Sequence, residues 1–284
     1  MAGATIAVTG STGRLGGRVA RRLAAQGVPQ RLVVRDPARA PTLPGAEVRA
    51  ASYGDRAALG RALEGVETLL FVSAAESRDR LRQHATVVEA AAASGVRHVV
   101  YTSFFGAAPD ATFTLARDHA ATEALLRDAG VAWTFLRDNL YLDFFPMMVG
   151  DDGVIRGPAG QGRAAAVAQD DIADAAAAVL RDPAPHASRT YDLTGPAALG
   201  LDEVAEALAQ HLGRSVRYVE ETVEEAYRSR ERYGAERWQV DAWVSTYLAI
   251  AAGELERVTR DVERVAGHPA TPLAQVLRRI TSST

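Results

Sequence analysis

The sequence has no cysteine, and this absence excludes disulfides, thiolate metal sites and a cysteine nucleophile. It has no apolar run as long as the roughly 18 residues that predict a membrane-spanning helix. The N-terminus leads directly into a strand pattern without a signal peptide, which favours a cytoplasmic protein. A formal net charge of −3 argues against broad binding to nucleic acid or to a membrane surface.

Patterns typical of metal-dependent and serine-dependent hydrolases are missing as well. None of the six histidines has a second histidine at H-x-x-x-H or similar spacing, and the chain has no G-x-S-x-G elbow. We therefore expect no metal site. What is present is ordinary for a globular protein: 48% of the 284 residues are hydrophobic and 24% are charged. That length suits one large domain or a domain with a lobe.

The clearest motif is the stretch TIAVTGSTGRLG, residues 5–16. Its apolar start predicts a buried strand, three glycines follow as G-x-x-G-x-x-G, and residues 14–25 have apolar side chains at helical spacing. This strand, turn and helix are typical of a unit that binds a dinucleotide pyrophosphate, although a turn without a ligand is the alternative. We expect the cofactor contacts of this stretch to come from Gly10, Ser11, Thr12, Gly13, Arg14 and Leu15.

The second expected strand, residues 31–35, ends where dinucleotide folds contact the adenosine ribose. An acidic residue there would bind the 2′-hydroxyl of NAD, whereas an arginine accommodates the 2′-phosphate of NADP. The residue is Arg35, and Arg39 follows one helical turn later, so we predict a preference for NADP(H) over NAD(H). Asp36 is a second candidate, although Asp36-Pro37 is also typical of a turn, and Arg35 could be a solvated charge.

Strand and helix patterns continue to alternate along the chain. The expected strands are residues 47–51, 68–73, 97–102 and 131–136, and the expected helices include residues 81–94 and 116–129. With the first two strands, this alternation predicts an α/β fold, a Rossmann-type doubly wound parallel sheet. Because ligands lie outside the carboxyl ends of parallel strands, Ser73 and Ala74 should lie beside the cofactor.

The alternation loosens after Arg137. Residues 138–149 are aromatic and apolar, and they could cover the nicotinamide end or simply form core; residues 150–162 are glycine-rich and predict a flexible loop. Further helices are expected at 170–180, 201–212, 222–253 and 273–280, with strands at 190–194 and 217–219. We expect residues 1–150 to form the NAD(P)-binding domain and residues 151–284 a small C-terminal α/β substrate lobe, partly interleaved with the sheet.

Several segments together resemble a known family. They are TGSTGRLGG, LVVRDPARA, YGDRAAL, GVETLLFVS, GVRHVVYTS, HAATEALLRDAGVAWTFLRDNLYLDFF and GHPATPLAQVL. The chain is similar to the NmrA-like group of atypical short-chain dehydrogenases, and within it to NAD(P)H:quinone oxidoreductases and triphenylmethane reductases. The resemblance implies bound NADP(H), a C-terminal lobe and a cleft for an aromatic acceptor. We expect Asn139 to contact the cofactor, while Asp138 stands where the resemblance would place Asn.

The resemblance also shows which catalytic groups are missing. Typical short-chain dehydrogenases use a Ser and Tyr-x-x-x-Lys, and aligning Glu123 with the glutamate of extended members puts His119 at the Lys position and Leu115 at the Tyr position. His119 could touch the nicotinamide ribose or the substrate, or make only a local hydrogen bond. Ser103 could contact substrate or cap the strand end. We name His119 and Tyr141 as the catalytic candidates.

Two functions remain open at this stage. The first is an NADPH-dependent reductase of a quinone or similar conjugated aromatic, whose reduced product needs no strong acid in the site. The second is an NAD(P)-binding redox sensor without turnover, and an isomerase or epimerase is disfavoured by the missing Tyr. The expected partner is a small aromatic molecule, with no nucleic acid and no membrane. The sequence leaves open whether the chain is a monomer or a homodimer.

Overall fold

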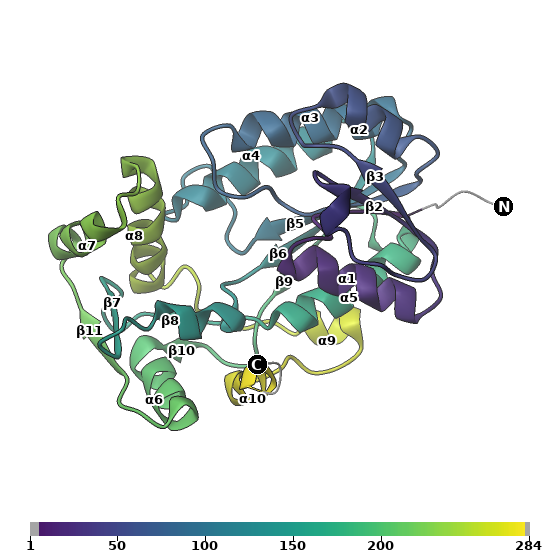
Figure 1. The fold of residues 1–284 in the computed structure, drawn as a ribbon. Coiled ribbons are helices and arrows are strands. Elements are labelled where there is room, and N and C mark those ends of the chain that lie inside the picture. The colour runs from purple at the N-terminus through teal and green to yellow at the C-terminus, as the bar shows by residue number, and fades with distance from the viewer. Residues whose placement is uncertain (1–5, 282–284) are drawn as a thin grey trace. The chain divides into compact units, whose positions relative to one another are not determined.

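The computed structural model describes residues 6–281, and Figure 1 shows the path of the chain. The chain divides into two units, each built from segments that are discontinuous in sequence. Unit 1 contains residues 6–104, 118–137 and 170–191, and unit 2 contains residues 105–117, 138–169 and 192–281. The assignment of cofactor binding to residues 1–150 and of substrate binding to residues 151–284 stays a prediction.

The centre of the fold is a seven-stranded sheet with the order β3-β2-β1-β4-β5-β6-β9. In that order the strands are Ala46–Ala50, Gln30–Val34, Ile6–Thr9, Thr68–Phe71, His98–Phe104, Ala132–Asp138 and Arg189–Leu193. The register of β1 with β2 and β4 is parallel, as is that of β2 with β3 and β4 with β5. The order reverses at β1 and β4, which defines a doubly wound sheet. The predicted α/β class is confirmed.

The last strand, β9, extends the sheet beyond the six strands that the βα alternation predicted. Its alignment with β6 is parallel, because Ser188 N–H donates to Trp133 O at one end and Asn139 N–H donates to Leu193 O at the other. Residues 190–194 were expected as a strand but without a place in the sheet. The sequence could not place it, since the pairing partner of an edge strand is set by tertiary packing.

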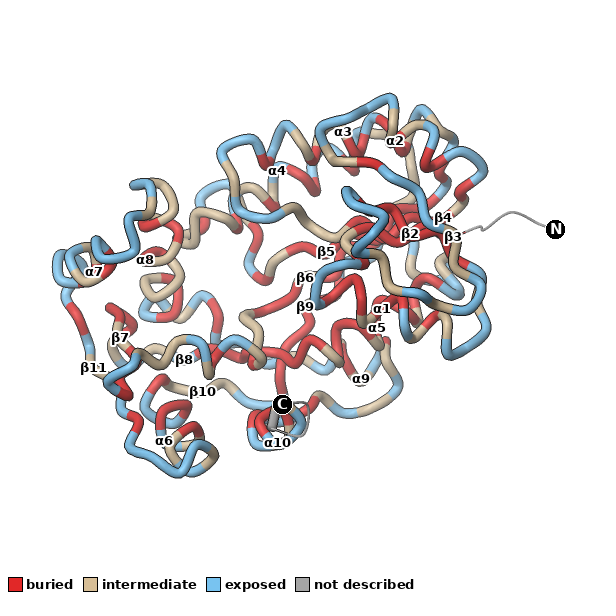
Figure 2. The backbone as a smooth tube through the Cα atoms, viewed as in Figure 1, coloured by how far each residue is buried: buried red, intermediate tan, exposed pale blue. Residues whose placement is uncertain are grey.

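Helices flank the sheet in the way the apolar periodicity requires. Figure 1 shows α2 (Arg56–Leu63), α3 (Arg80–Ala93) and α4 (Thr114–Asp128) on one face, and α1 (Arg14–Ala25) and α5 (Gln169–Arg181) on the other. Helices α1 and α5 are tied together by ion pairs from Arg22 to Asp170 and Asp174. Every residue of β1, β2 and β4 is buried, and Figure 2 shows these strands in red between helices with exposed outer faces.

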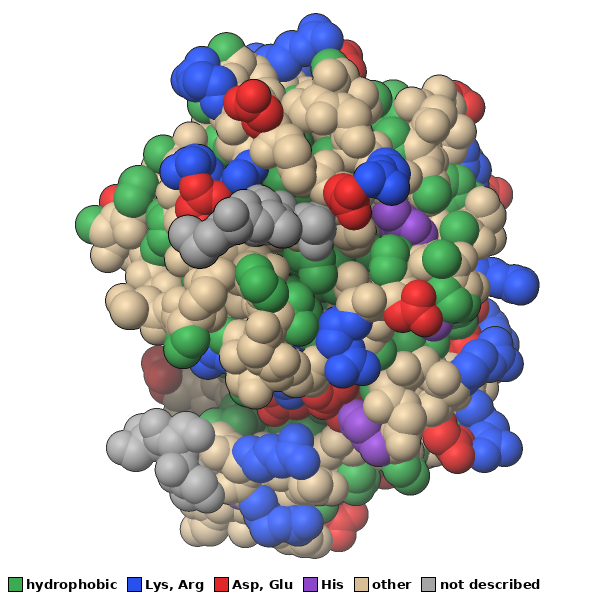
Figure 3. Space-filling view, turned by 90° about the vertical axis from the view of Figure 1, so that its right-hand side faces the viewer, with side chains coloured by type: hydrophobic (Ala, Val, Ile, Leu, Met, Phe, Trp, Pro, Cys, Tyr) green, Lys and Arg blue, Asp and Glu red, His purple; other side chains and the backbone are tan. Residues whose placement is uncertain are grey.

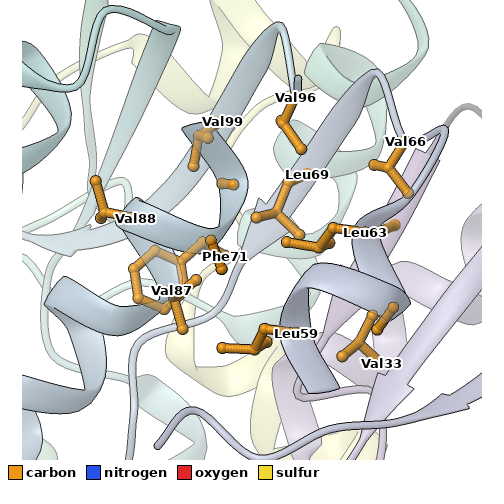
Figure 4. Close-up of a cluster of buried hydrophobic side chains, with 14 of the residues drawn as sticks. Val33, Leu59, Leu63, Val66, Leu69, Phe71, Val87, Val88, Val96 and Val99 are labelled. Atoms are coloured by element: carbon orange, nitrogen blue, oxygen red, sulfur yellow. The ribbon is translucent and has the colours of Figure 1, made fainter. Parts of the chain in front are cut away.

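The principal core of unit 1 lies between the sheet and α2 and α3. Figure 4 shows side chains of Leu59 and Leu63 from α2 and Val87 from α3 pointing toward Leu69 and Phe71 from β4. Burying each large apolar side chain contributes roughly 1.5–3 kcal/mol. The strands that contribute to this core also lead to the edge of the sheet where the predicted cofactor residues lie. The core therefore fixes the positions of those residues.

Unit 2 contains the remaining elements. Its helices are α6 (Leu201–Leu212), α7 (Val223–Arg230), α8 (Arg237–Ala251), α9 (Asp261–Ala266) and α10 (Leu273–Thr281), with a 3₁₀ segment η2 (Leu142–Met148). Strand β7 (Val154–Gly157) pairs parallel with β11 (Arg217–Glu220), and β8 (Arg163–Ala164) pairs antiparallel with β10 (Leu199–Gly200). A small apolar cluster of Ala226, Val240 and Val244 joins α7 to α8.

The prediction of a flexible loop over residues 150–162 is wrong. This stretch contains β7, and its glycines serve close packing rather than mobility. A Cβ on Gly157 would lie 2.2 Å from the ring of Tyr247, and one on Gly162 would lie 2.1 Å from Ile250 O. The expected helix over 222–253 is also interrupted, because Gly234 has a φ of +59° that ends the first part. Helix α9 was missed because six residues carry little periodicity.

No helix within residues 6–281 is both long enough and apolar enough to cross a membrane. Figure 3 shows one face of the molecule, where basic and acidic side chains are interspersed. Such mixing accords with the formal net charge of −3.

Candidate functional site

The glycine turn between β1 and α1 has the conformation that its sequence predicts. Gly10 has a φ of +63°, which favours glycine, and Gly13 N–H donates to Gly10 O at 2.9 Å. Gly13 is the N-cap of α1, and a Cβ on Gly16 would lie only 2.4 Å from Gly10 O. Each glycine therefore has its own reason: backbone conformation at Gly10, an open helix start at Gly13, and close contact between helix and turn at Gly16.

The start of α1 fits an anionic group. Thr12, Gly13 and Arg14 are exposed there, and the first turn of the helix has no acidic residue. Ser11 is buried, yet its Oγ has no hydrogen-bond partner within residues 6–281. The helix N-terminus supplies unsatisfied N–H groups and a positive dipole end, as a pyrophosphate requires. Leu15 is buried, so that only its backbone is suited to such a contact.

Two arginines follow β2 at the predicted ribose position. Arg35 and Arg39 are both exposed, and within residues 6–281 neither guanidinium has a carboxylate within ion-pair distance. Asp36 is occupied differently: its Oδ1 accepts a hydrogen bond from Ala38 N–H at 3.0 Å and caps a short 3₁₀ turn. The carboxylate that could have bound a ribose 2′-hydroxyl is therefore used in the turn, while the cations remain available.

The residues after β4 are held by the protein itself. Ser73 N–H donates to Thr102 Oγ1 at 2.9 Å, and Ala74 N–H donates to His84 Nε2 at 2.9 Å. The carbonyl of Ala74 accepts from Arg80 Nε at 3.0 Å. The polar backbone groups of Ala74 are thus used within the fold, and the predicted contact of this residue with a cofactor would have to be apolar.

A buried network that sequence reasoning missed surrounds His119. Arg80 Nη2 lies 2.9 Å from His119 Nε2, and because a guanidinium only donates, Nε2 must be the unprotonated nitrogen. The proton then sits on Nδ1, which donates to Tyr101 Oη at 2.9 Å. His84 has the same tautomer, since its Nε2 accepts from Ala74 and its Nδ1 donates to Thr122 Oγ1 at 2.7 Å.

Burial keeps both histidines neutral. It lowers the pKa of His84 to about 3, with Arg80 adding to the effect. Burial, followed by Arg80, also lowers the pKa of His119 well below its ordinary value. A histidine that is neutral and has both nitrogens bonded to Arg80 and Tyr101 is poorly suited to protonate a substrate. The catalytic role predicted for His119 stays a prediction, and these contacts favour a positioning role.

Ser103 and Glu123 belong to a second buried cluster. Ser103 Oγ donates to Glu123 Oε1 at 2.7 Å, and Arg137 binds both oxygens of the same carboxylate at 2.8 and 2.7 Å. Arg127 adds a further bond at 2.9 Å. The proton of the Ser103 hydroxyl is therefore used within this cluster and is not available to a substrate oxygen. The chain also contains no lysine, so that no Tyr–Lys pair can form anywhere in it.

The segment after β6 carries the unit 2 candidates. Asn139 is fully buried: its Nδ2 donates to Leu255 O at 3.0 Å and its Oδ1 accepts from Leu140 N–H at 2.7 Å. Both ends of the amide therefore hold the segment in place, and the predicted cofactor contact of Asn139 is left without support. Tyr141 is half-buried, its hydroxyl lies 3.2 Å from Asp138 Oδ2, and its ring meets the edge of Phe144.

The candidates divide between the two units. Unit 1 contains the glycine turn, Arg35, Ser73, Ala74 and His119, whereas unit 2 contains Asn139 and Tyr141. The motif residues could be found from local patterns. Arg80, His84 and Tyr101 could not, because they meet only when α3, β5 and α4 pack together.

Comparison with known proteins gives a consistent family. The model of the NmrA-like family matches residues 3–244. Quinone oxidoreductase 2 of Escherichia coli strain K12 is 35% identical over 278 residues, which cover 95% of this chain and 96% of that protein. An NAD(P)H azoreductase of Xenophilus azovorans is 32% identical over 275 residues, with coverages of 95% and 96%.

A solved structure shares the fold over nearly the whole chain. It is the triphenylmethane reductase of Citrobacter sp. complexed with NADP(H), which superposes with a TM-score of 0.86 at 33% identity. The match covers 96% of this chain and 99% of that one.

Proposed function

The chain belongs to the NmrA-like family, and from that premise we propose that it is an NADPH-dependent reductase that transfers hydride to a quinone or a similar conjugated aromatic acceptor. The observation that carries the proposal is the glycine turn. Its exposed helix start, its positive φ at Gly10 and the unpartnered Oγ of Ser11 fit a dinucleotide pyrophosphate. When bound, the reduced nicotinamide supplies the hydride.

The two arginines after β2 support NADP(H) as the cofactor. Arg35 and Arg39 are exposed and unpaired with carboxylates within residues 6–281, and Asp36 is engaged in its turn. A guanidinium gains a charge-assisted bond from a 2′-phosphate, which NAD lacks. The named relatives include a protein that is complexed with NADP(H), and its likeness to this chain extends over both units.

The acceptor class follows from the groups that are missing. Leu115 replaces the tyrosine of typical short-chain dehydrogenases, no lysine is present, and His119 is buried and neutral. Hydride transfer to an isolated ketone makes a strongly basic alkoxide that needs an acid nearby. A quinone gives a delocalised phenolate, and a cationic dye is simply neutralised. The relatives named for quinone, azo and triphenylmethane substrates support the same class.

A redox sensor without turnover is the second candidate function. It is favoured by the structural use of Ser103 and His119, whose polar atoms are bonded to Glu123, Arg80 and Tyr101. Such a protein would bind NAD(P) and present different surfaces to a partner in its two redox states.

One experiment separates these functions. Purified protein would be mixed with NADPH and with a panel of quinones, azo and triphenylmethane dyes and simple ketones, and NADPH oxidation would be followed by its absorbance. We expect turnover with quinones or dyes and little with ketones. Tight NADPH binding by calorimetry without any turnover would favour the sensor, and efficient ketone reduction would contradict the acceptor class.

The remaining parts of the proposal concern the setting of the protein. We propose a cytoplasmic location, in keeping with the lack of cysteine, and a small aromatic molecule as its main partner. Whether two chains associate is tested directly by light scattering coupled to size-exclusion chromatography, with a dimer giving twice the mass of the 30.2 kDa chain.

A further inference from the structure

The carboxyl ends of three strands of unit 1, β3, β1 and β4, are joined by a small set of hydroxyl contacts. Tyr53, which follows β3, places its Oη 2.6 Å from Thr9 Oγ1 at the end of β1. The same Oη lies 2.7 Å from Val72 O, directly after β4. Val72 N–H donates to Thr9 Oγ1 at 2.9 Å, and Thr9 Oγ1 lies 3.0 Å from Leu70 O. We call Tyr53, Thr9 and Val72 the hydroxyl clamp.

The phenol of Tyr53 is the donor that the clamp requires. It has one proton and the carbonyl of Val72 only accepts, so that Tyr53 donates either to Val72 O or to Thr9 Oγ1. Either bond ties the loop after β3 to the centre of the sheet. Burial raises the pKa of Tyr53 above its ordinary value, while the bond to Thr9 and the positive charge of Arg35 oppose the rise. The phenol therefore keeps its proton near neutral pH.

The ring of Tyr53 is fixed by the core of unit 1. It packs against the principal apolar cluster and meets the ring of Phe71 edge-on, with centroids 5.5 Å apart and planes at 77°. Phe71 is the last residue of β4 and is labelled in Figure 4. Replacement of Tyr53 by Phe would keep this packing and remove only the hydroxyl, so that the two contributions can be measured separately.

The clamp is continuous with the glycine turn. Thr9 directly precedes Gly10, and a Cβ on Gly10 would lie 3.0 Å from Val72 Cβ. A Cβ on Gly16 would lie 2.7 Å from Thr9 O, so that the first turns of α1 rest on the residue whose side chain the clamp holds. A shift of Thr9 or Val72 would therefore displace the N–H groups at the start of α1, which a pyrophosphate needs at hydrogen-bond distance.

We infer that Tyr53 is a positioning residue for dinucleotide binding, whose hydroxyl holds the ends of β1 and β4 at the separation that the glycine turn needs. The inference rests on the proposed cofactor site and deepens it. Tyr53 acts through Thr9 and Val72, which share its hydroxyl. NADPH and NADH have the same pyrophosphate, so Tyr53 supports both cofactors, whereas Arg35 supports only the one with a 2′-phosphate.

The variant Tyr53→Phe tests this role. We expect Kd, measured by isothermal titration, to rise about fivefold for NADPH and for NADH alike, which corresponds to one lost hydrogen bond. With a quinone acceptor, KM for NADPH should rise by a similar factor, while kcat at saturating NADPH stays unchanged because only cofactor binding is weakened.

The variant Tyr218→Phe is the matched control. Tyr218 is a half-buried tyrosine of unit 2, whose Oη donates to Gly157 O at 2.7 Å and accepts from Ala159 N–H at 3.1 Å. Both variants lose the bonds of a phenol hydroxyl, so both should lower the free energy of unfolding in urea. Only Tyr53→Phe should weaken dinucleotide binding.

Replacements of Thr9 test the path from Tyr53 to the turn. Thr9→Ser keeps the hydroxyl and should bind both cofactors as the unmodified chain does. Thr9→Val removes the hydroxyl with little change in shape and should weaken both, and it carries the same comparison should Tyr53→Phe not fold. In the double variant the loss should be smaller than the product of the two single losses, because both changes remove the same contact.

The outcomes separate this inference from the function on which it rests. If Tyr53→Phe lowers the free energy of unfolding but leaves both Kd values unchanged, Tyr53 only stabilises the fold and the inference is overturned, while the proposed function stands. A loss confined to NADPH would also overturn it, since the effect would then belong to the 2′-phosphate. Losses that multiply fully in the double variant would overturn the path through Thr9. If the unmodified chain binds neither dinucleotide, the proposed function fails and the inference fails with it.

Discussion

At the scale of single residues, the clearest division is between groups that face solvent and groups that the fold has already engaged. Arg35 and Arg39 are exposed without a carboxylate partner within residues 6–281, whereas Ser103, His119 and Asn139 are buried in hydrogen bonds. A sequence pattern gives only the type of residue at a position. It cannot show whether that side chain faces solvent or is already hydrogen-bonded inside the fold. The contacts of a residue decide which predicted roles its side chain can still perform.

Replacement of Arg35 by Ala tests the cofactor preference. We expect NADPH affinity to fall about tenfold or more, because a charge-assisted arginine–phosphate bond contributes on the order of 1.5–3 kcal/mol, and NADH affinity to stay unchanged. Isothermal titration with both cofactors measures this. Arg61→Ala, at an exposed arginine of α2, controls for loss of net charge. Equal loss for both cofactors would contradict a contact with the 2′-phosphate.

Replacement of His119 by Ala tests its role in the buried network. Arg80 Nη2 would lose the acceptor His119 Nε2, and Tyr101 Oη would lose the donor His119 Nδ1. We therefore expect the free energy of unfolding to drop by about 1–3 kcal/mol and kcat to change by less than about tenfold. Urea unfolding and steady-state kinetics on the same samples give both quantities. A hundredfold loss of kcat with unchanged unfolding would restore His119 as a catalytic residue.

At the scale of elements, local pattern predicted most helices and strands closely. Helix α1 begins and ends where its apolar spacing and its glycines indicated, and α6 spans the expected residues before Gly213, whose φ is +63°. Asp55 caps α2 by accepting from Ala58 N–H. These signals depend on neighbours within a few residues. Strand β7 was missed because its partner β11 lies about 60 residues further along the chain.

The element that should tolerate least change for cofactor binding is the glycine turn. In Gly13→Val the Cβ would lie 3.2 Å from Gly10 O, which a small shift relieves, but the added methyls would cover the start of α1. We expect a folded protein that no longer binds NADPH, as judged by circular dichroism and calorimetry. Gly60→Ala, in a helix position with nothing within 4 Å, should leave binding unchanged. Normal binding by folded Gly13→Val would contradict the assigned phosphate site.

At the scale of the whole molecule, the family and the fold class were predictable, whereas the buried polar network was not. The order of alternating patterns is enough to indicate a doubly wound sheet, and the motifs indicate the family. His84 and His119 are 35 residues apart and are linked only in the packed structure, where Arg80 donates to His119 Nε2 and, like His84, bonds the backbone of Ala74. Their neutral state is a product of burial, which depends on the complete core rather than on any motif.

This buried neutral state predicts that the molecule loses stability in acid. His84 has a pKa of about 3 in the folded protein and about 6.5 when unfolded, so that the folded state binds fewer protons below the unfolded value. Its stabilising contribution is complete above pH ~6.5 and is lost as the pH falls toward ~3. Between pH 7.5 and 5 the loss should be about 2 kcal/mol. Urea unfolding across this pH range measures the loss of stability.

The variant His84→Gln keeps an acceptor for Ala74 N–H but does not titrate. It should flatten the pH dependence of stability relative to the His211→Gln control. Parallel curves for the two variants would show that His84 is not the group responsible.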